Sequence, residues 1–364
     1  MAPKKQPVLT LAPLVFFALL FPGCAHFLQP QTALPDRVLA EPKVYRGVYH
    51  VHSKFSHDSK SSLKTISKTA RRAGLDFVVI TDHNNRDAAA SLPQAEMPLI
   101  IDGEEISAPD GHLVALGTGE KAPEVKDSAE LIAWIHERGG IAMLAHPVSV
   151  RNPWRRMEPG TFDGMEVYNF AHELYPANKF KLMMKAGFLT PHAFLRSFQK
   201  KPEASLTVWD ELLKHRHVAA IGASDAHVHF KFLGFSSESL LLLFQAVTVN
   251  VIADSLEEKP VIQALGRGRS FLSFDVRGIA RDFSFTAAHG DTVFDMGDEV
   301  PGGGTVLRVH VPQASRIRLI SGGALRSETE GTFLDYPVTE AGAWRVEVYR
   351  DGKIWIISNP IYII

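Results

Sequence analysis

Four short fragments of the chain carry histidine, or histidine with aspartate, at points where an apolar, β-branched run ends. They are His50-Val51-His52, Thr81-Asp82-His83, Ala145-His146-Pro147 and Asp225-Ala226-His227. Two fragments place their polar residues two positions apart, and on a strand that spacing puts both side chains on one face. Imidazoles and carboxylates that converge on one point are metal ligands. The fragments therefore predict a metal site at the ends of several strands.

Further candidate ligands lie between these fragments. Asp58 occurs in Ser56-His57-Asp58-Ser59, Glu105 closes Asp102-Gly103-Glu104-Glu105, and His112 opens an adjacent strand. The full set of candidate metal ligands is His50, His52, Asp58, His83, Glu105, His112, His146, Asp225 and His227. Nine donors are too many for one tetrahedral ion and suit two or three divalent ions that share a carboxylate. Histidine with carboxylate favours zinc, manganese or iron over calcium or magnesium.

Strands and helices alternate from Tyr45 onward, which predicts an α/β fold. The expected strands are 44–51, 77–81, 99–106, 112–116, 141–145, 164–168 and 218–222, and the expected helices are 62–73, 128–138 and 206–214. This alternation implies parallel βαβ units. About seven such units would fit a closed barrel, with its functional groups at the carboxyl ends of the strands. After about Asp275 the sequence alternates polar and apolar residues between glycine-rich turns, which predicts a small antiparallel β-sandwich.

Composition excludes some classes of protein and of site. The chain has 364 residues, is 45% hydrophobic and carries a formal net charge of −1. That balance gives no electrostatic case for a nucleic-acid binder, which usually has a basic surplus. Its one cysteine, Cys24, rules out an intrachain disulfide and a cysteine-based zinc site.

The residues around Cys24 resemble a bacterial lipoprotein signal peptide. Lys4 and Lys5 precede an apolar stretch that is shorter than a membrane-spanning helix, and Gly23 comes directly before Cys24. The resemblance implies a signal peptide over 1–24, lipidation of Cys24 and a proline-containing tether over 25–44. We therefore expect a lipid-anchored protein of the bacterial cell envelope, periplasmic or on the outer face. A cleaved secretory signal and an uncleaved anchor are the alternatives.

The chain resembles the polymerase-and-histidinol-phosphatase (PHP) domain family from about Tyr45 to Asp275. The matching pieces are His50-x-His52 with Ser56-His57-Asp58, Thr81-Asp82-His83, Gly103-x-Glu105-Ile106-Ser107, His146-Pro147 and Ser224-Asp225-x-His227. The resemblance implies a distorted (β/α)7 TIM-like barrel over 45–274 with a trinuclear metal site. The end of the chain, from Trp355, resembles secreted or lipoprotein PHP-type metallohydrolases and relatives of carbaryl hydrolase. Those proteins carry a β-sandwich after the barrel, here expected over 275–364.

The resemblance also implies how the ligands are divided among the ions. Glu105 is the expected bridge, and the position after His50-x-His52 is open between His57 and Asp58, with Asp58 favoured. The implied sets are His50, His52, Glu105 and Asp225 on one ion, Glu105, His112 and His146 on a second, and Asp58, His83 and His227 on a third.

Metal-bound water as a nucleophile would make such a site hydrolytic. The candidate catalytic residues are Glu105, Asp225 and His57, with His57 or His172 as a general acid. Arg151, Arg155 and Arg156 follow His146 and would contact an anionic substrate, unless they are surface charges of a loop.

We expect a phosphoesterase acting on a small anionic or ester substrate. A hydrolase of carboxyl esters, amides or carbamates on the same site is an alternative. A catalytically silent cell-surface binding protein is another. We expect Asp82 to orient a ligand histidine and Glu104 to point away from Glu105. The sequence names no protein partner.

Overall fold

The computed structural model describes residues 43–92, 97–156, 161–174, 184–185, 187–227 and 236–364. All of them belong to one compact unit. Cys24, the expected signal peptide and nearly all of the expected tether lie outside the described residues. Within the described residues, no helix has the length and apolar character needed to cross a membrane.

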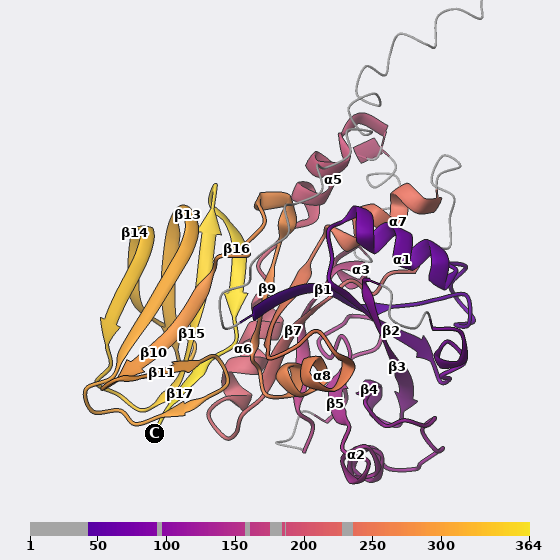
Figure 1. The fold of residues 1–364 in the computed structure, drawn as a ribbon, viewed down its shortest axis with the longest axis horizontal. Coiled ribbons are helices and arrows are strands. Elements are labelled where there is room, and N and C mark those ends of the chain that lie inside the picture. The colour runs from indigo at the N-terminus through magenta and orange to yellow at the C-terminus, as the bar shows by residue number, and fades with distance from the viewer. Residues whose placement is uncertain (1–42, 93–96, 157–160, 175–183, 186, 228–235) are drawn as a thin grey trace, which may run out of the picture. The chain divides into compact units, whose positions relative to one another are not determined.

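The first part of the chain alternates strands and helices (Figure 1). Its strands are β1 (Lys43–Val51), β2 (Phe77–His83), β3 (Leu99–Ala108), β4 (Gly111–Leu116), β5 (Ile141–Leu144), β6 (Gly164–Asn169), β7 (Ala219–Ala223), β8 (Thr248–Ala253) and β9 (Ser270–Ser273). Its helices are α1 (Leu63–Arg72), α2 (Ser128–Glu137), α3 (Phe170–Leu174), α5 (Pro191–Phe198), α6 (Glu203–Leu212), α7 (Ser236–Phe244) and α8 (Glu258–Gly266). The mixed α/β class predicted from the sequence is confirmed.

Helix α1 illustrates how the local sequence sets these elements. The Ser62 side chain accepts a hydrogen bond from the backbone N–H of Thr65 at 3.1 Å and caps the helix start. Leu63, Ile66 and Ala70 recur at helical spacing and are buried against β1 and β2. Gly74 follows the last turn with a φ of +66°, a left-handed conformation typical of helix ends.

Strand pairing departs from the parallel units expected from the sequence. β1–β2, β2–β3, β5–β6 and β6–β7 are parallel, but β4 is antiparallel to both β3 and β5. The connection between β3 and β4 is only Pro109-Asp110, and a hairpin of that length can join antiparallel strands only. β8 is likewise antiparallel to β1 and β9.

The segment after β7 returns to β1. The backbone N–H of Ser224 donates to the Tyr49 carbonyl at 3.0 Å, and that of Ala226 donates to the His50 carbonyl at 3.2 Å. Val51 and Ala226 form an isolated parallel bridge. The ends of the first and seventh strands therefore lie side by side; a fully closed barrel remains a prediction.

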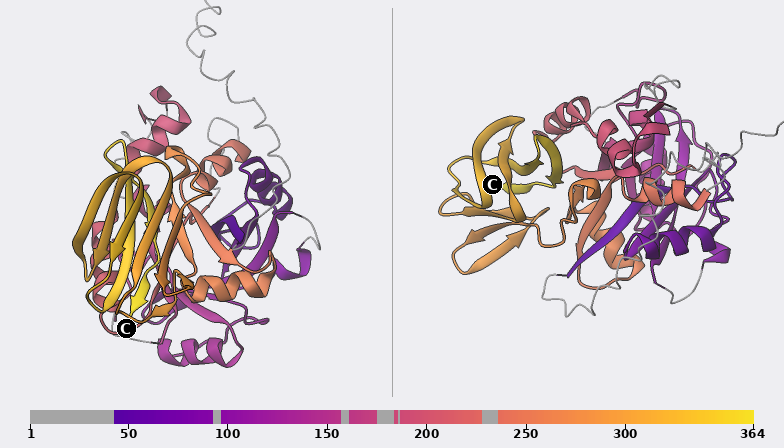
Figure 2. Two further views of the ribbon diagram at one scale, coloured as in Figure 1. Left: turned by 60° about the vertical axis from the view of Figure 1, so that its left-hand side comes forward. Right: turned by 90° about the horizontal axis from the view of Figure 1, so that it is seen from above.

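The last part of the chain consists of strands without α-helices among the described residues, drawn orange to yellow in Figures 1 and 2. Their pairings are antiparallel except for β12 with β17, which is parallel. The strands are β10 (Ser284–His289), β11 (Thr292–Asp295), β12 (Glu299–Val300), β13 (Val306–Ser321), β14 (Ala324–Pro337), β15 (Gly342–Arg350), β16 (Lys353–Ser358) and β17 (Ile361–Ile363). β13 pairs with β10, β14 and β15, and β16 pairs with β9 of the first part. The two-layer sandwich and the boundary at 274/275 remain predictions.

Candidate metal centre

Most of the nine predicted donors come from strand ends and from the loops that follow them, whereas Glu105 lies within β3 and His112 near the start of β4. His50 and His83 lie in the last two positions of β1 and β2, and His146 and Asp225 lie two positions beyond β5 and β7. Three of these residues have left-handed backbones, with φ of +64° at His50, +33° at His146 and +49° at Asp225. Strained backbone at non-glycine residues tends to cluster at functional sites. In β1 this turn coincides with an irregular register between Val48 and Val51.

The donors surround one cavity of about 350 Å³. Seven of the nine contribute to its lining, while His50 and His52 lie beneath it and are fully buried. The lining residues are His57, Asp58, His83, Glu105, Ser107, His112, His146, Arg151, Asn152, His172, Asp225 and His227. The structure thus brings together side chains that are far apart in the sequence.

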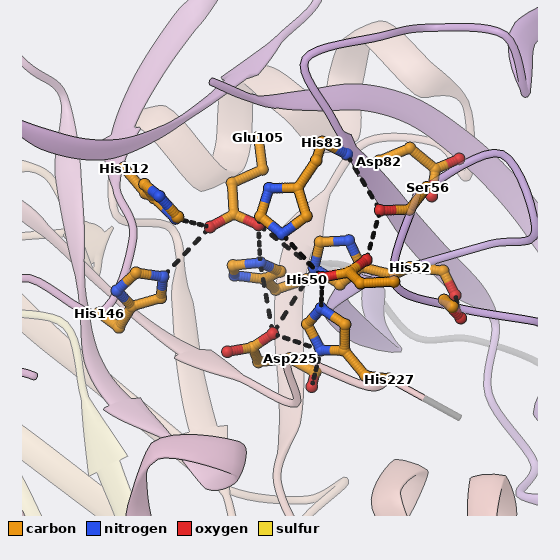
Figure 3. Close-up of polar contacts among 12 residues, drawn as sticks. His50, His52, Ser56, Asp82, His83, Glu105, His112, His146, Asp225 and His227 are labelled. Carbon is orange, nitrogen blue, oxygen red and sulfur yellow. Dashed lines mark hydrogen bonds and ion pairs between the residues drawn. The ribbon is translucent and has the colours of Figure 1, made fainter. Parts of the chain in front are cut away.

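Glu105 occupies the middle of the cluster and is almost fully buried (Figure 3). Its Oε1 lies 2.7 Å from His112 Nδ1 and 3.1 Å from His146 Nε2. Its Oε2 lies 3.0 Å from His50 Nε2, 3.2 Å from His52 Nε2 and 3.3 Å from His83 Nδ1. The two oxygens therefore face two different sets of imidazoles, which is the arrangement a bridging carboxylate requires.

Asp225 also faces the Nε2 atoms of His50 and His52. Its Oδ1 lies 3.7 Å from His50 Nε2, 3.5 Å from His52 Nε2 and 3.0 Å from His227 Nδ1. Its Oδ2 lies 3.3 Å from Nε2 of His172. The two predicted pairs, His50/His52 and Asp225/His227, thus meet across the seam between β1 and the segment after β7.

Asp58, rather than His57, joins the donors. Asp58 Oδ2 lies 2.9 Å from His227 Nε2 and 3.2 Å from His83 Nε2, and its Oδ1 accepts a hydrogen bond from Ser56 Oγ at 2.6 Å. The His57 ring lines the cavity with its centre 5.1 Å from that of His83. The position of Asp58 agrees with the choice favoured from the sequence.

Four groups of side chains place one donor atom each within 4.8 Å of one another. They are His52, Asp58, His83 and His227; His50, His52 and Asp225; His83, Glu105 and His112; and His146, His172 and Asp225. Both ring nitrogens of His52 are buried without a hydrogen-bond partner. Because buried polar atoms are nearly always satisfied, this orphaned imidazole fits a metal ligand. The donor set therefore suits divalent metal ions.

The charges of the cluster are strongly coupled. Burial alone would raise the pKa of Glu105, but the charge of His50 and hydrogen bonds from His112 and His146 hold it well below its usual range. The same balance keeps the pKa of Asp225 low, with His50 as its main counter-charge. Burial lowers the pKa of His227, but its contacts with Asp225 and Asp58 raise it to about 10. The carboxylates thus create a field that attracts cations to the imidazoles.

Glu166 on β6 supports two of the donors from behind. Its Oε1 lies 2.5 Å from His50 Nδ1, and its Oε2 accepts hydrogen bonds at 2.8 Å from the backbone N–H of His146 and from Asn169 Nδ2. A carboxylate that holds the second ring nitrogen of a histidine fixes the ring's orientation. The sequence offered only the presence of an acidic residue in an apolar strand as a signal for this role.

Asp82 and Glu104 meet different partners. Asp82 accepts hydrogen bonds at 2.6 Å from the backbone N–H and the hydroxyl of Ser53, so it fixes the turn after His52 rather than holding a histidine ring. The hypothesis that Asp82 orients a ligand histidine through a hydrogen bond was therefore wrong. Glu104 accepts the backbone N–H of Ala122 at 2.8 Å and points away from the cluster, as alternation along β3 predicts.

The three arginines after His146 separate into different roles. Arg151 lines the cavity, whereas Arg155 is exposed and is not part of the lining. The Arg156 guanidinium donates to both carboxylate oxygens of Asp110 at 2.9 and 2.7 Å. The structure therefore places Arg151 beside the donors and gives Arg155 no contact with the cavity.

His172 and Ser149 extend the cluster beyond the nine donors. His172, expected from sequence only as a proton donor, stacks on His146 with ring centres 4.2 Å apart and contacts Asp225. Ser149 hydrogen-bonds to His172 Nδ1. A serine three residues after His146 carries no motif by which sequence reasoning could have found it.

Comparisons with known proteins identify a family and two similar proteins. Residues 49–142 match the PHP domain family. An uncharacterized protein of Methanocaldococcus jannaschii, MJ1587, is 30% identical over 138 residues, which are 34% of this chain and 81% of that protein. A crystal structure from Bacteroides vulgatus, of a two-domain protein "containing predicted PHP-like metal-dependent phosphoesterase", aligns over 88% of this chain and 95% of its own. Its identity is 14% and its TM-score 0.42, a likeness too slight to support an argument.

Proposed function

We propose that this chain, which belongs to the PHP domain family, is a metal-dependent hydrolase and specifically a phosphoesterase. The observation that carries the proposal is the position of Glu105, whose two oxygens face separate sets of imidazoles. A carboxylate shared in this way is typical of centres with more than one ion. We infer two or three divalent ions, zinc, manganese or iron, held by the nine predicted donors.

Divalent ions supply Lewis acidity when bound, and they lower the pKa of water toward neutrality. The protein's own residues contribute position and charge. Glu105 and Asp225 fix the spacing of the imidazoles on either side of His50 and His52. Arg151 at the cavity wall would bind the negative charge of a phosphate group, because a guanidinium matches the geometry of its oxygens.

His57 is the proposed proton donor to the leaving group. Its side chain lines the cavity next to His83. A positioned histidine typically contributes 10²–10⁴-fold to such a step. The cavity lining also includes Arg151 and Asn152, which would face the rest of a small anionic substrate.

Metal content and turnover together test the proposal. The full-length chain is measured for bound metal and for hydrolysis of p-nitrophenyl phosphate, bis-p-nitrophenyl phosphate and p-nitrophenyl acetate. We expect at least one tightly bound ion per chain and turnover of a phosphate substrate. Asp225→Ala and His52→Ala should abolish both. His136→Ala is the matched control. His136 lies on α2, pairs with Asp163 at 2.9 Å and is not part of the cavity lining.

Three outcomes would contradict the proposal in different ways. Less than one ion per chain excludes the metal centre. Turnover of the acetate ester without any phosphatase activity favours a hydrolase of carboxyl esters or carbamates on the same site. A metal-loaded chain with no turnover of any substrate supports the catalytically silent binding protein instead.

We further propose that the protein is lipid-anchored through Cys24. The support is the charged start, the short apolar stretch and the glycine before the cysteine. Fractionation of cells that produce the full chain should place it in the membrane fraction, and Cys24→Ser should release it. Membrane retention of the serine variant would contradict lipidation.

A further inference from the structure

His172 lies beside the candidate metal centre, where it contacts Asp225 and stacks on His146. Its Nε2 is 3.3 Å from Asp225 Oδ2, whereas His50, His52 and His227 all face Asp225 Oδ1. The two oxygens of Asp225 therefore have separate environments. Oδ1 faces the imidazoles of His50, His52 and His227, and Oδ2 faces His172.

Asp225 and Ser149 together set which nitrogen of His172 carries the proton. Asp225 Oδ2 faces His172 Nε2, and a carboxylate can only accept, so the imidazole proton resides on Nε2. Nδ1 is then the acceptor of the ring, and the Ser149 hydroxyl donates to it. The Ser149 oxygen also accepts the backbone N–H of Arg151 at 3.2 Å.

A chain of hydrogen bonds connects His172 to the support of a second ligand. The backbone N–H of His172 donates to Asn169 Oδ1 at 3.1 Å, and Asn169 Nδ2 donates to Glu166 Oε2 at 2.8 Å. Glu166 in turn holds His50 Nδ1 and the backbone of His146. Glu166, Asn169 and His172 lie three residues apart along β6 and α3, so one short segment supports the ligands from behind.

We propose that His172 is a positioning residue for the metal centre: it donates from Nε2 to Asp225 Oδ2 and so turns Oδ1 toward the ions. Ser149 holds the ring in the state that can donate. This inference rests on the proposed function, since it requires that Asp225 bind metal. Loss of a hydrogen-bond partner behind a metal ligand typically lowers metal affinity by 10–100-fold.

Two substitutions at His172 separate positioning from direct ligation. His172→Ala removes the donor, whereas His172→Gln keeps an N–H at about the position of Nε2 but is a poor metal ligand. Competition with a chromophoric chelator measures the affinity for Zn²⁺, and the visible spectrum of the Co²⁺-loaded chain reports on ligand geometry. We expect His172→Ala to weaken one ion by about 10–100-fold and His172→Gln to restore most of that affinity.

Ser149→Ala gives an independent measurement should the alanine variant at His172 fail to fold. It should lower metal affinity in the same direction and by less, because the ring remains but its proton is no longer fixed. His136→Ala, which removes a histidine–aspartate pair outside the cavity, should leave the affinity and the Co²⁺ spectrum unchanged.

The outcomes distinguish this inference from the proposed function. A wild-type chain that binds no metal overturns both. Metal binding by the wild type that neither His172→Ala nor Ser149→Ala weakens overturns the inference alone. Equal loss of metal in His172→Ala and His172→Gln also overturns it, because His172 would then be a ligand itself.

Discussion

Glu105 has a matched neighbour against which its role can be measured. Glu104 is equally buried but points to the other side of β3, where it accepts the Ala122 N–H. Glu105→Gln keeps the shape of the side chain, removes its charge and turns one oxygen into a donor that faces imidazoles. We expect it to lose at least one bound ion and to lower phosphatase turnover on the order of 100-fold, whereas Glu104→Gln retains both. Equal behaviour of the two variants in metal analysis would remove Glu105 from the centre.

The charges of the cluster predict how the metal-free chain responds to pH. Burial lowers the pKa of His227, but Asp225 and Asp58 raise it from 6.5 to about 10. A folded-state pKa above the unfolded value gives stability that is fully present below pH 6.5 and is lost as pH rises through about 10. The free energy of unfolding of the chelator-treated chain should therefore fall by up to ~1.4 kcal/mol per pH unit across that window.

Urea unfolding at several pH values measures this effect. His227→Gln should reduce the dependence of the free energy of unfolding on pH. The dependence that remains comes from His50 and His146, whose pKa values are also raised. An unchanged slope in His227→Gln would show that the proton is held elsewhere. Because each metal ion displaces such protons, metal affinity should in turn rise with pH.

Spacing in the sequence singled out candidate donors that the structure brings together, but not the residues that support them. His50/His52 and Asp225/His227 stand out because two polar residues flank one apolar residue at a strand end. Glu166 has no such pattern, because its role comes from a ladder pairing of β6 with β7 and from contacts with distant residues. Ser149 is a single hydroxyl in a loop. Support of this kind depends on tertiary contacts, which one sequence does not encode locally.

Among the elements before β8, the strands and the helices α1, α2 and α6 were predicted to within a few residues, whereas the helices α3, α5 and α7 were missed. The antiparallel direction of β4 was not predicted, because apolar runs indicate burial and not strand direction. β8 and β9 were also missed. They pair with each other and with β1, so their place depends on contacts across the chain.

A buried ion pair connects β1 to the segment after β9. Arg46 on β1 donates to Asp275, which lies two residues beyond β9, and to the Gly74 carbonyl at 3.0 Å. Asp275 is buried, and Thr248 on β8 donates to its other oxygen at 2.9 Å. Arg46→Met would leave Asp275 buried without its counter-charge. Breaking a buried pair in this way typically costs 3–5 kcal/mol.

Equilibrium unfolding in denaturant measures the loss for Arg46→Met. Arg138→Met serves as the control, because Arg138 pairs with Glu120 at the surface and such pairs contribute about 0–1 kcal/mol. Similar stability of the two variants would mean that water reaches Asp275. Arg46→Met combined with Asp275→Leu should recover part of the loss, since no unpaired charge then remains.

At the scale of the whole molecule, the C-terminal strands share a hydrophobic core with the first part of the chain. Tyr349, Ile354 and Ile357 pack in the same cluster as Leu206 and Trp209 of α6. Arg345 on β15 also donates to both oxygens of Asp210 on α6 at 2.9 Å. The change in sequence texture near Asp275 predicted a change in secondary structure. It carried no information on this shared core, because the contacts join residues more than a hundred positions apart.

The Asn359 side chain also connects the two parts of the chain. It follows β16 and is buried, and its amide imitates a peptide group between β7 and β9. Its Oδ1 accepts the Ala220 N–H at 2.7 Å, and its Nδ2 donates at 2.9 Å to the carbonyls of Ala220 and Ser270. Asn359→Leu would fill the same space and remove the partner of the Ala220 N–H and carbonyl, whereas the Ser270 carbonyl still accepts the backbone N–H of residue 359. Each buried unsatisfied group costs about 1–3 kcal/mol, so we expect a loss of roughly 2 kcal/mol or more.

Denaturant unfolding followed by tryptophan fluorescence and by circular dichroism measures the loss of stability. It also shows whether the two optical signals change together. Asn359→Asp keeps the acceptor for the Ala220 N–H but aims a second oxygen at two carbonyls, so it should destabilise the chain as well. Gln313→Leu, at an exposed position of β13, should leave stability within about 0.5 kcal/mol of the wild type. Because Asn359 bonds to β7, whose end leads into Asp225, we expect the two optical signals to shift together. A variant in which only one signal shifts would show that the C-terminal strands unfold independently of the metal centre.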